Sequence, residues 1–203
     1  DLIHHNKNKM IDIVPNGVDT DFFKPNKQTP RFDLIFTGNM NYPPNVKCAE
    51  VLAKEILPEV HKILPNVTLV IAGANPSKAV KNLHSKFITV TGWVNDLRDY
   101  YNSSKIFIAP LVIGTGLQNK LLEAMAMQLP CITSSLANNA LEAKEDHEIL
   151  IGKTISDYSH HIIRLLNNPQ EADLLATNGY QFIQKKYTWD SVGTMIDNII
   201  SRK

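Results

Sequence analysis

The chain has 203 residues, 43% of them hydrophobic, and its 21 Lys and Arg nearly balance its 20 Asp and Glu. This length suits one large domain, or one domain with appended segments, and it can bury a sizeable core without disulfides or metals. The net charge of +1 argues against a protein that binds nucleic acid or a membrane surface by charge, because such proteins normally carry a basic excess.

The first thirty residues are predicted to form a linker rather than a regular element. The segment VPNGVDTDFF contains Pro15-Asn16-Gly17, a strong turn signal, which is followed by acidic residues and a phenylalanine pair. We therefore expect an interdomain linker over residues 1–30, tethered to the core of a domain that spans residues 31–203.

Short apolar runs then alternate with longer amphipathic stretches. The runs are apolar throughout, which is typical of strands in a parallel sheet that helices cover on both faces. Strands are predicted at 33–37, 67–72, 87–91, 105–109, 131–134 and 148–151. Helices are predicted between them at 45–63, 77–84, 96–103, 116–128 and 138–145. The alternation predicts an α/β fold with a doubly wound, parallel, six-stranded sheet.

The residues after the last strand have a helical pattern. It predicts three further helices at 155–167, 169–186 and 188–200, with Pro169 in a first turn, where proline is tolerated. This C-terminal tail, about 155–203, is expected to pack against the sheet or against a neighbouring domain.

Glycines mark the edge of the sheet at which a ligand is expected. Ligands of open parallel sheets bind outside the carboxyl ends of the strands. Gly38, Gly73 and Gly92 each follow one of the first three predicted strands. A single glycine is a common way to end a strand, but the three together favour a crevice that is lined by backbone.

The loop GTGLQNK joins the fourth strand to the helix LLEAMAM. Thr115 and Gln118 fit a capping box, which would start the helix at residue 116. The flanking Gly114 and Gly116 would let a phosphate approach the free amides of the first turn, where the helix dipole favours an anion. The chain has neither the six-residue dinucleotide fingerprint nor a Walker phosphate loop.

Glu123 is a lone carboxylate in this otherwise apolar helix, and burying it without a partner would be costly. One interpretation pairs it with Lys120 on an exposed face. The other places it in the crevice, about 10 Å along the helix from the anion site, where it accepts the two vicinal hydroxyl groups of a ribose. Trp93, after the third strand, lies either beside a nucleobase or at the rim as a packing residue.

Other kinds of site are not indicated. Cys48 and Cys131 form no CxxC pair, so neither a disulfide nor a thiolate zinc site is expected, and the histidines lack metal-binding spacing. We find no Ser-His-Asp or Cys-His arrangement. No apolar run reaches about 18 residues and the start lacks a signal-peptide core, so a cytoplasmic protein is expected. We interpret the start at Asp1, without an initiator Met, as a cut near a domain boundary.

Several motifs, in order, resemble a known family. VPNGVDTDFF, IAGANP, VTGWVNDLRDYY and IAPLVIGTGLQNKLLEAMAMQLPCITS are similar to the C-terminal, donor-binding half of family 4 (group 1) retaining glycosyltransferases of the two-Rossmann-domain (GT-B) type. The similarity extends from about residue 13 to residue 200. More narrowly, GNMNYPPNVKCAE with GTGLQNKLLEAMAM resembles the bacterial sugar transferases of polysaccharide biosynthesis.

The resemblance implies a site for a UDP- or GDP-linked sugar, in a cleft against an N-terminal acceptor domain. Glu123 matches the second Glu of the family's Glu-x7-Glu motif, which binds the ribose. The other matched positions lie near the base, at Trp93 and Val94, and near the diphosphate, at Gly38, Gly116 and Leu117.

Two positions depart from the family's pattern. Thr115 stands where the first Glu of that motif is expected, so the contact with the donor sugar must differ. Asn39 stands where the family has an Arg that neutralises the diphosphate, and the next lysine, Lys47, lies in a predicted helix. We expect Lys120 to supply the missing positive charge and to stabilise the diphosphate as it leaves, which would be its catalytic role.

The activity that the resemblance implies is transfer of a glycosyl group with retention. The helix N-terminus and Lys120 would ease departure of the nucleoside diphosphate, so no metal or other cofactor is expected. In the family, the catalytic His and the acceptor site belong to the N-terminal domain, so this chain alone is expected to bind donor but to be inactive. Peripheral attachment of the full-length enzyme to the membrane stays open. Two alternatives are a non-catalytic sugar-nucleotide-binding module and a nucleotide-sugar epimerase or phosphorylase of the same architecture.

Overall fold

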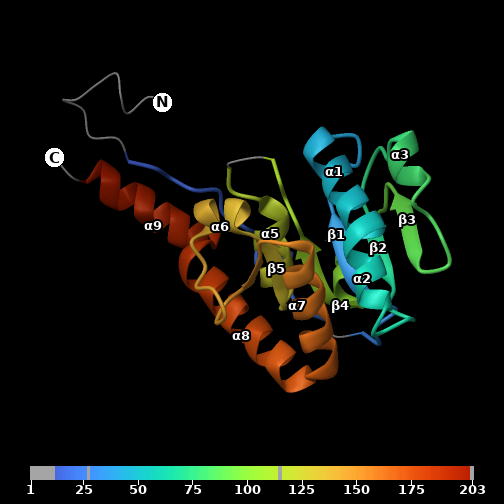
Figure 1. Ribbon diagram of the computed structural model, residues 1–203. Helices are drawn as coiled ribbons and strands as arrows, with labels where there is room; N and C mark the ends of the chain where they lie inside the picture. The colour runs from blue at the N-terminus through green and yellow to red at the C-terminus, as the bar shows by residue number, and fades with distance from the viewer. Residues whose placement is uncertain (1–11, 27, 114–115, 202–203) are drawn as a thin grey trace.

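The computed structural model describes residues 12–26, 28–113 and 116–201, which form an α/β fold around a central sheet (Figure 1). Six parallel strands lie in the order β3-β2-β1-β4-β5-β6, so the strand order switches sides between β1 and β4. The strands are β1 Phe32–Thr37, β2 Leu69–Ala72, β3 Ile88–Gly92, β4 Ser104–Ala109, β5 Cys131–Ser134 and β6 Leu150–Gly152. The predicted parallel six-stranded sheet is confirmed, and each strand lies within two residues of its predicted bounds.

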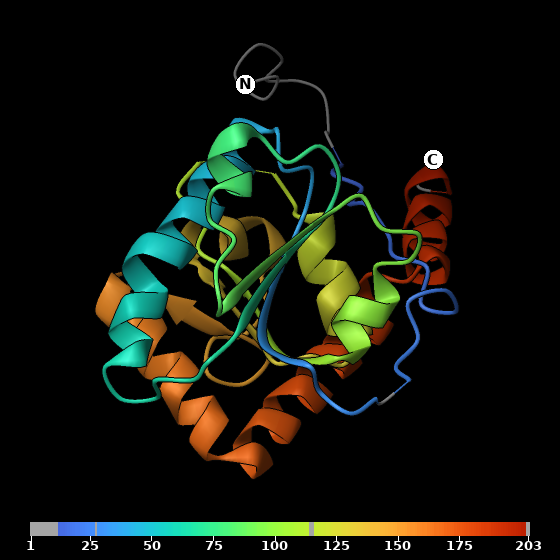
Figure 2. The same ribbon diagram turned by 90° about the vertical axis from the view of Figure 1, so that its right-hand side faces the viewer.

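Helices cover both faces of the sheet. The helices α1, α2 and α7 lie on one side and α4 and α5 on the other (Figure 2), while α8 packs against α5 and α9 packs against α8. The helical elements are α1 Pro43–Val51, the π-helical turn η2 Leu52–Ile56, α2 Leu57–His61, α3 Lys78–Lys81, α4 Arg98–Asn102, α5 Asn119–Ala126, α6 Ser135–Leu141, α7 Ile155–Asn167, α8 Pro169–Lys186 and α9 Trp189–Ile200. None of the described helices is both long and apolar enough to cross a membrane.

Burial explains why the strands are apolar without alternation. Every residue of β2, β5 and β6 is buried, and only one residue of β4 is exposed. The edge strand β3 is half-buried along most of its length. A central parallel strand is covered on both faces, so side chains that point to either face meet apolar neighbours.

The three C-terminal helices each begin at a residue whose side chain caps them. Thr154 and Asp157 form a capping box at α7, the Asn168 side chain caps α8, and the Thr188 side chain caps α9. Such caps satisfy backbone N–H groups that have no partner inside the helix. The helices predicted for this tail are confirmed to within one residue.

The helix predicted at 138–145 is displaced, because α6 spans Ser135–Leu141. The Ser134 hydroxyl, at the end of β5, accepts a hydrogen bond from the N–H of Ala137 at 3.3 Å and so starts the helix directly after the strand. Glu142 then takes a left-handed conformation, with φ of +59°, which ends the helix.

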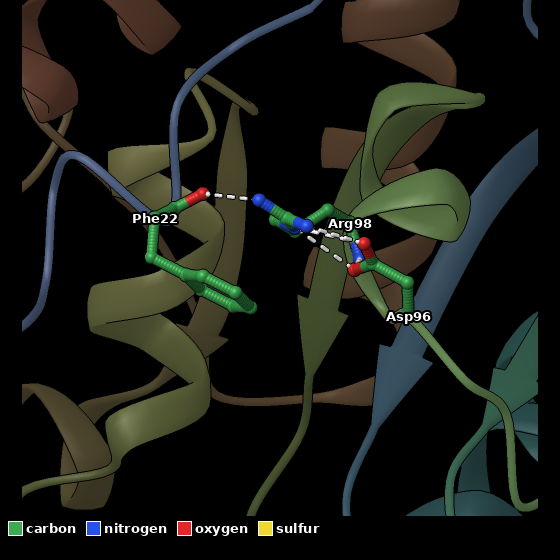
Figure 3. A network of polar contacts seen from close by, with 3 residues as sticks. All are labelled: Phe22, Asp96 and Arg98. Atoms are coloured by element: carbon green, nitrogen blue, oxygen red, sulfur yellow. Dashed lines mark hydrogen bonds and ion pairs between the residues drawn. The ribbon is translucent and has the colours of Figure 1, made fainter.

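Contacts with distant parts of the chain hold the segment before β1. The N–H of Val18 donates to the carbonyl oxygen of Tyr187 at 2.7 Å, at the junction of α8 and α9. The guanidinium of Arg98 in α4 lies 3.9 Å from the ring centroid of Phe22, and its Nη1 donates to the carbonyl oxygen of Phe22 at 3.1 Å (Figure 3). Asp96 accepts hydrogen bonds from Nε and Nη2 of the same guanidinium. The segment is therefore fastened to α4 as well as to the junction of α8 and α9.

Candidate functional site

A pocket of about 330 Å³ opens at the carboxyl ends of β1, β2 and β3, beside α5. It is lined by Thr37, Gly38, Asn39, Gly73, Ala74, Trp93, Val94, Leu97 and Glu123. This lining contains five of the ten residues predicted from the sequence, and they come from three separate segments. The pocket lies next to the switch in strand order, at the edge of the sheet where ligands of open parallel sheets bind.

Two glycines bring the ends of β1 and β2 into direct contact in this pocket. A Cβ on Gly73 would lie 1.9 Å from the carbonyl oxygen of Gly38, and both residues have positive φ, +143° at Gly73 and +153° at Gly38. No other residue type fits this contact without moving the backbone. The glycines after β1 and β2 therefore line the pocket with backbone, as the sequence predicted, whereas Gly92, the last residue of β3, is not among the lining residues.

Glu123 lies on the wall of the pocket and is half-buried. Its Oε2 accepts a hydrogen bond of 2.9 Å from the hydroxyl of Tyr101, and that hydroxyl lies 2.8 Å from Oγ1 of Thr37. Among the described residues, its hydrogen-bond partner is thus Tyr101 and not Lys120. The interpretation of Glu123 as half of an exposed ion pair with Lys120 is therefore wrong.

Lys120 extends from the first turn of α5 toward the end of β1. Its Nζ donates to Oδ1 of Asn45 at 2.5 Å and lies 5.2 Å from the ring centroid of Phe36. Nδ2 of Asn45 donates in turn to the carbonyl oxygen of Asn39 at 3.0 Å. A Cβ on Gly38 would lie 3.4 Å from Nζ of Lys120. The ammonium group therefore stands beside the glycine that lines the pocket.

Burial shifts the pKa of both charged groups toward the neutral form. It raises the pKa of Glu123, and the Tyr101 hydrogen bond and the Lys120 charge only partly offset this. It also lowers the pKa of Lys120, against the opposing effects of Cys48 and Glu123. A perturbed carboxylate and a perturbed ammonium at one pocket are typical of functional sites, because both charges lack full solvation until a ligand arrives.

The predicted start of the helix at residue 116 is wrong, because α5 begins at Asn119. Gln118 has an extended conformation at the N-cap, and its side-chain amide donates to the carbonyl oxygen of Gly116 at 2.9 Å. Gly116 and Leu117 therefore lie in the loop before the helix. Glu123 is only four residues into α5, about 6 Å from its start at 1.5 Å per residue, rather than about 10 Å.

The structure describes some of the remaining predicted residues but not all of them. Gly114 and Thr115, including the threonine of the predicted capping box, lie outside the described residues. Trp93 lines the pocket with 71% of its surface exposed, so its ring packs against little of the described chain. Val94 lines the pocket beside it.

Sequence reasoning missed three polar residues that organise the site: Thr37, Asn45 and Tyr101. All three are buried, and the side chain of each is hydrogen-bonded to a residue outside its own element. Burial of a polar group without such partners would be costly. Thr37 could have been suspected as a polar residue at the end of a buried strand, but Tyr101 and Asn45 carry no pattern in the sequence that marks them.

A second, larger pocket of about 430 Å³ lies at the opposite, amino-terminal edge of the sheet, where mainly apolar side chains line it. Its walls include Pro30, Leu129, Leu165 and Pro169. None of the predicted site residues that the structure describes lines this pocket. Glu123 and Lys120, with their perturbed pKa values, belong to the carboxyl edge, so we place the candidate site there despite the smaller volume.

Comparison with known proteins gives a family match. The sequence model of a family described as glycosyl transferases group 1 matches residues 31–168. An uncharacterized 44.6 kDa protein in the cps region of Klebsiella pneumoniae is 26% identical over 172 residues, which cover 77% of this chain and 44% of that protein. The UDP-Gal:alpha-D-GlcNAc-diphosphoundecaprenol alpha-1,3-galactosyltransferase of Escherichia coli is 28% identical over 180 residues, which cover 78% of this chain and 46% of that protein. The chain thus spans less than half the length of these relatives.

Solved structures show the same fold. Sucrose-phosphate synthase from Thermosynechococcus elongatus matches with a TM-score of 0.76 and 18% identity over 96% of this chain and 53% of that one. The C-terminal domain of the group 1 glycosyl transferase LpcC from Francisella tularensis matches with a TM-score of 0.70 and 20% identity, over 85% of this chain and 100% of that one. Anabaena HepE, solved with UDP and glucose, matches with a TM-score of 0.76 and 11% identity over 95% of this chain and 57% of that one.

Proposed function

The chain belongs to the group 1 glycosyl transferases, and on that premise we propose that its pocket binds a nucleoside diphosphate sugar, the donor in a glycosyl transfer. The observation that carries the proposal is the convergence of Gly38, Trp93 and Glu123 on one pocket, with the ammonium of Lys120 beside Gly38. These groups offer an aromatic face, a carboxylate and a cation against bare backbone. A nucleoside diphosphate presents a base, a diol and an anion in the same order.

Each part of the donor would meet one part of the pocket. The base would lie against Trp93 and Val94, which are free of core packing on that side. The carboxylate of Glu123 would accept the two ribose hydroxyl groups, since an ionised carboxylate has two acceptor oxygens. The diphosphate would lie over the backbone of Gly38, within reach of Lys120, because charged hydrogen bonds are the strong ones.

We propose that the reaction is transfer with retention at the anomeric carbon. The bond from that carbon to the diphosphate oxygen breaks, and a bond to a hydroxyl oxygen of the acceptor forms on the same face. Negative charge grows on the leaving nucleoside diphosphate, and the ammonium of Lys120 stabilises it there. The proposal assigns this role to Lys120 and to no metal or other cofactor. The acceptor, and the base that takes its proton, would be held by the rest of the full-length protein.

The division of the protein is also a proposal. Residues 1–30 would link this donor domain, residues 31–203, to an acceptor-binding domain, and this chain alone would bind donor without transferring it. Support comes from relatives that are more than twice as long as the part matched here. We also propose a cytoplasmic role in cell-surface polysaccharide synthesis. The names of two relatives support the polysaccharide part of this proposal, since one lies in a cps region and the other transfers galactose from UDP-Gal.

Titration calorimetry of this chain with UDP, GDP, ADP and CMP tests the proposal. We expect one nucleoside diphosphate, UDP or GDP, to bind more tightly than the others, with the affinity depending on both the base and the diphosphate. Binding of none of the four would overturn the proposed function. If GDP binds most tightly, GDP replaces UDP as the ligand in the tests of substituted chains.

Replacing Lys120 with methionine should weaken UDP binding about 10-fold and leave uridine binding unchanged, because the variant loses a charged hydrogen bond to the diphosphate. Methionine fills similar space against Phe36, so the fold should survive. The matched control is Lys47→Met, which removes an exposed lysine from α1. If Lys47→Met weakens UDP binding and Lys120→Met does not, the charge has been assigned to the wrong lysine.

A non-catalytic sugar-nucleotide-binding module is the second candidate. It is favoured by Asn39, which stands where the family has an Arg and whose Oδ1 accepts the N–H of Asn41 within its own turn. Assaying the full-length protein with UDP-sugars distinguishes the two: an enzyme releases UDP by transfer or slow hydrolysis, whereas a binding module leaves the sugar nucleotide intact.

A further inference from the structure

Tyr101 of α4 lies behind the pocket and connects two residues of its wall. Its side chain is fully buried, and its hydroxyl lies within hydrogen-bonding distance of Thr37 at the end of β1 and of Glu123 in α5. Phe23 and Phe107 hold the ring in place, at centroid distances of 6.4 and 6.2 Å. The hydroxyl is therefore fixed between two elements that contribute to the same site.

The direction of these hydrogen bonds follows from chemistry. An ionised carboxylate only accepts, so the Tyr101 hydroxyl must donate to Oε2 of Glu123. The oxygen of Tyr101 can then accept the hydroxyl proton of Thr37. Both O–H dipoles point toward Glu123 and strengthen each other. Among the described residues, no donor approaches the other oxygen, Oε1, of Glu123.

We infer that Tyr101 is a positioning residue, whose hydroxyl holds one oxygen of Glu123 so that the carboxylate stays on the pocket wall, ready for the hydroxyl groups of a ribose. The inference rests on the proposed function of the pocket and adds a residue that would not touch the ligand itself. Packing alone does not need this hydroxyl, because phenylalanine fills nearly the same volume. A buried hydroxyl is costly without partners, and here both partners belong to the site.

Tyr101→Phe, titrated with UDP and with 2′,3′-dideoxy-UDP, tests the inference. We expect the affinity for UDP to fall about 10-fold, as for a lost charged hydrogen bond, while the affinity for the dideoxy compound stays at its value in the parent chain. Added to Glu123→Ala, which has no side chain left to position, the change should weaken UDP binding no further. A loss that is equal for both nucleotides, or no loss for either, would overturn the positioning role.

The neighbouring Tyr100 provides the matched control. It lies in the same helix and is half-buried. Its ring stacks on the ring of Phe32, at a centroid distance of 6.3 Å, and is not part of the pocket wall. Tyr100→Phe should therefore change neither the affinity for UDP nor the affinity for the dideoxy compound. If Tyr101→Phe does not fold, Thr37→Val removes the hydroxyl behind Tyr101 and should give a smaller loss that again requires the ribose hydroxyl groups.

Nucleotide binding by the parent chain distinguishes a failure of the proposed function from a failure of the positioning role. If it binds none of the four nucleotides of the panel, the proposed function fails and the inference with it. If it binds UDP and the dideoxy compound equally, the ribose contact of Glu123 is wrong, although a nucleotide site remains. If it prefers UDP but Tyr101→Phe keeps that preference in full, only the positioning role of Tyr101 is wrong.

Discussion

Glu123→Gln should weaken the binding of UDP about 100-fold without lowering the melting temperature. Two hydrogen bonds from ribose to a charged acceptor become bonds to a neutral one, which loses about 2–3 kcal/mol of binding free energy. The amide of glutamine can still accept the Tyr101 hydroxyl, so the pocket wall should keep its shape. Calorimetry gives the affinity, and thermal unfolding gives the stability.

The matched control is Glu55→Gln, which changes an exposed glutamate of η2 outside the pocket. This control should change neither the affinity for UDP nor the melting temperature. If Glu123→Gln binds UDP as tightly as the parent chain, the carboxylate does not contact the nucleotide. If the variant instead melts well below the parent, Glu123 has a structural role that the hydrogen bond to Tyr101 does not reveal.

The pH dependence of this variant's stability has a definite sign. The pKa of Glu123 is raised in the folded chain, so the native state holds this proton more tightly than the unfolded chain. The group therefore favours folding below the ordinary value of 4.5, and that contribution is lost as the pH rises through the raised pKa. The difference in stability between Glu123→Gln and the parent chain should thus favour the variant more at neutral pH than in acid. Melting temperatures measured over this range check the sign.

Gly73→Ala should lower the free energy of unfolding by about 3–5 kcal/mol, the range of severe steric and backbone changes. The new Cβ would lie 1.9 Å from the carbonyl oxygen of Gly38, so the ends of β1 and β2 would have to separate. The φ of +143° adds strain for any residue with a side chain. Unfolding in urea measures the loss.

Gly193→Ala is the control for this substitution. Gly193 lies within α9, and a Cβ there would meet no atom within 4 Å. Because alanine is the better helix former, this variant should gain about 0.5–1 kcal/mol. A stability of Gly73→Ala within about 1 kcal/mol of the parent would mean that the two strand ends separate easily and do not define the pocket.

The fold was largely predictable because its strands are short, continuous and apolar, a pattern that only a sheet covered on both faces explains. The starts of α5 and α6 were not. Residue 116 looked like a helix start because Thr115 and Gln118 fit a capping box, but Gln118 takes an extended conformation while Asn119 accepts a hydrogen bond from the Asn16 side chain. Such a boundary depends on contacts between distant segments, which periodicity does not contain.

The residues of the candidate site were likewise predictable only in part. Glycines after strands and a carboxylate in an apolar helix are local signals, and they indicated Gly38 and Glu123. Tyr101 and Asn45 act through partners from other elements, so their importance appears only when the chain has folded. The sequence could indicate which residues face a ligand, but not which residues hold them in place.

The switch in strand order has a consequence for how the molecule opens. β1 pairs with β4 across a long stretch of chain, as between Leu34 and Ile106, and such non-local pairing is slow to form. The pocket straddles this seam, with Gly38 and Gly73 on one side and Lys120 and Glu123 on the other. A nucleotide bound there must be released before the two halves of the sheet can part. Occupancy of the pocket would therefore slow hydrogen exchange at the amides of β1 and β4 and leave that of α9 unchanged.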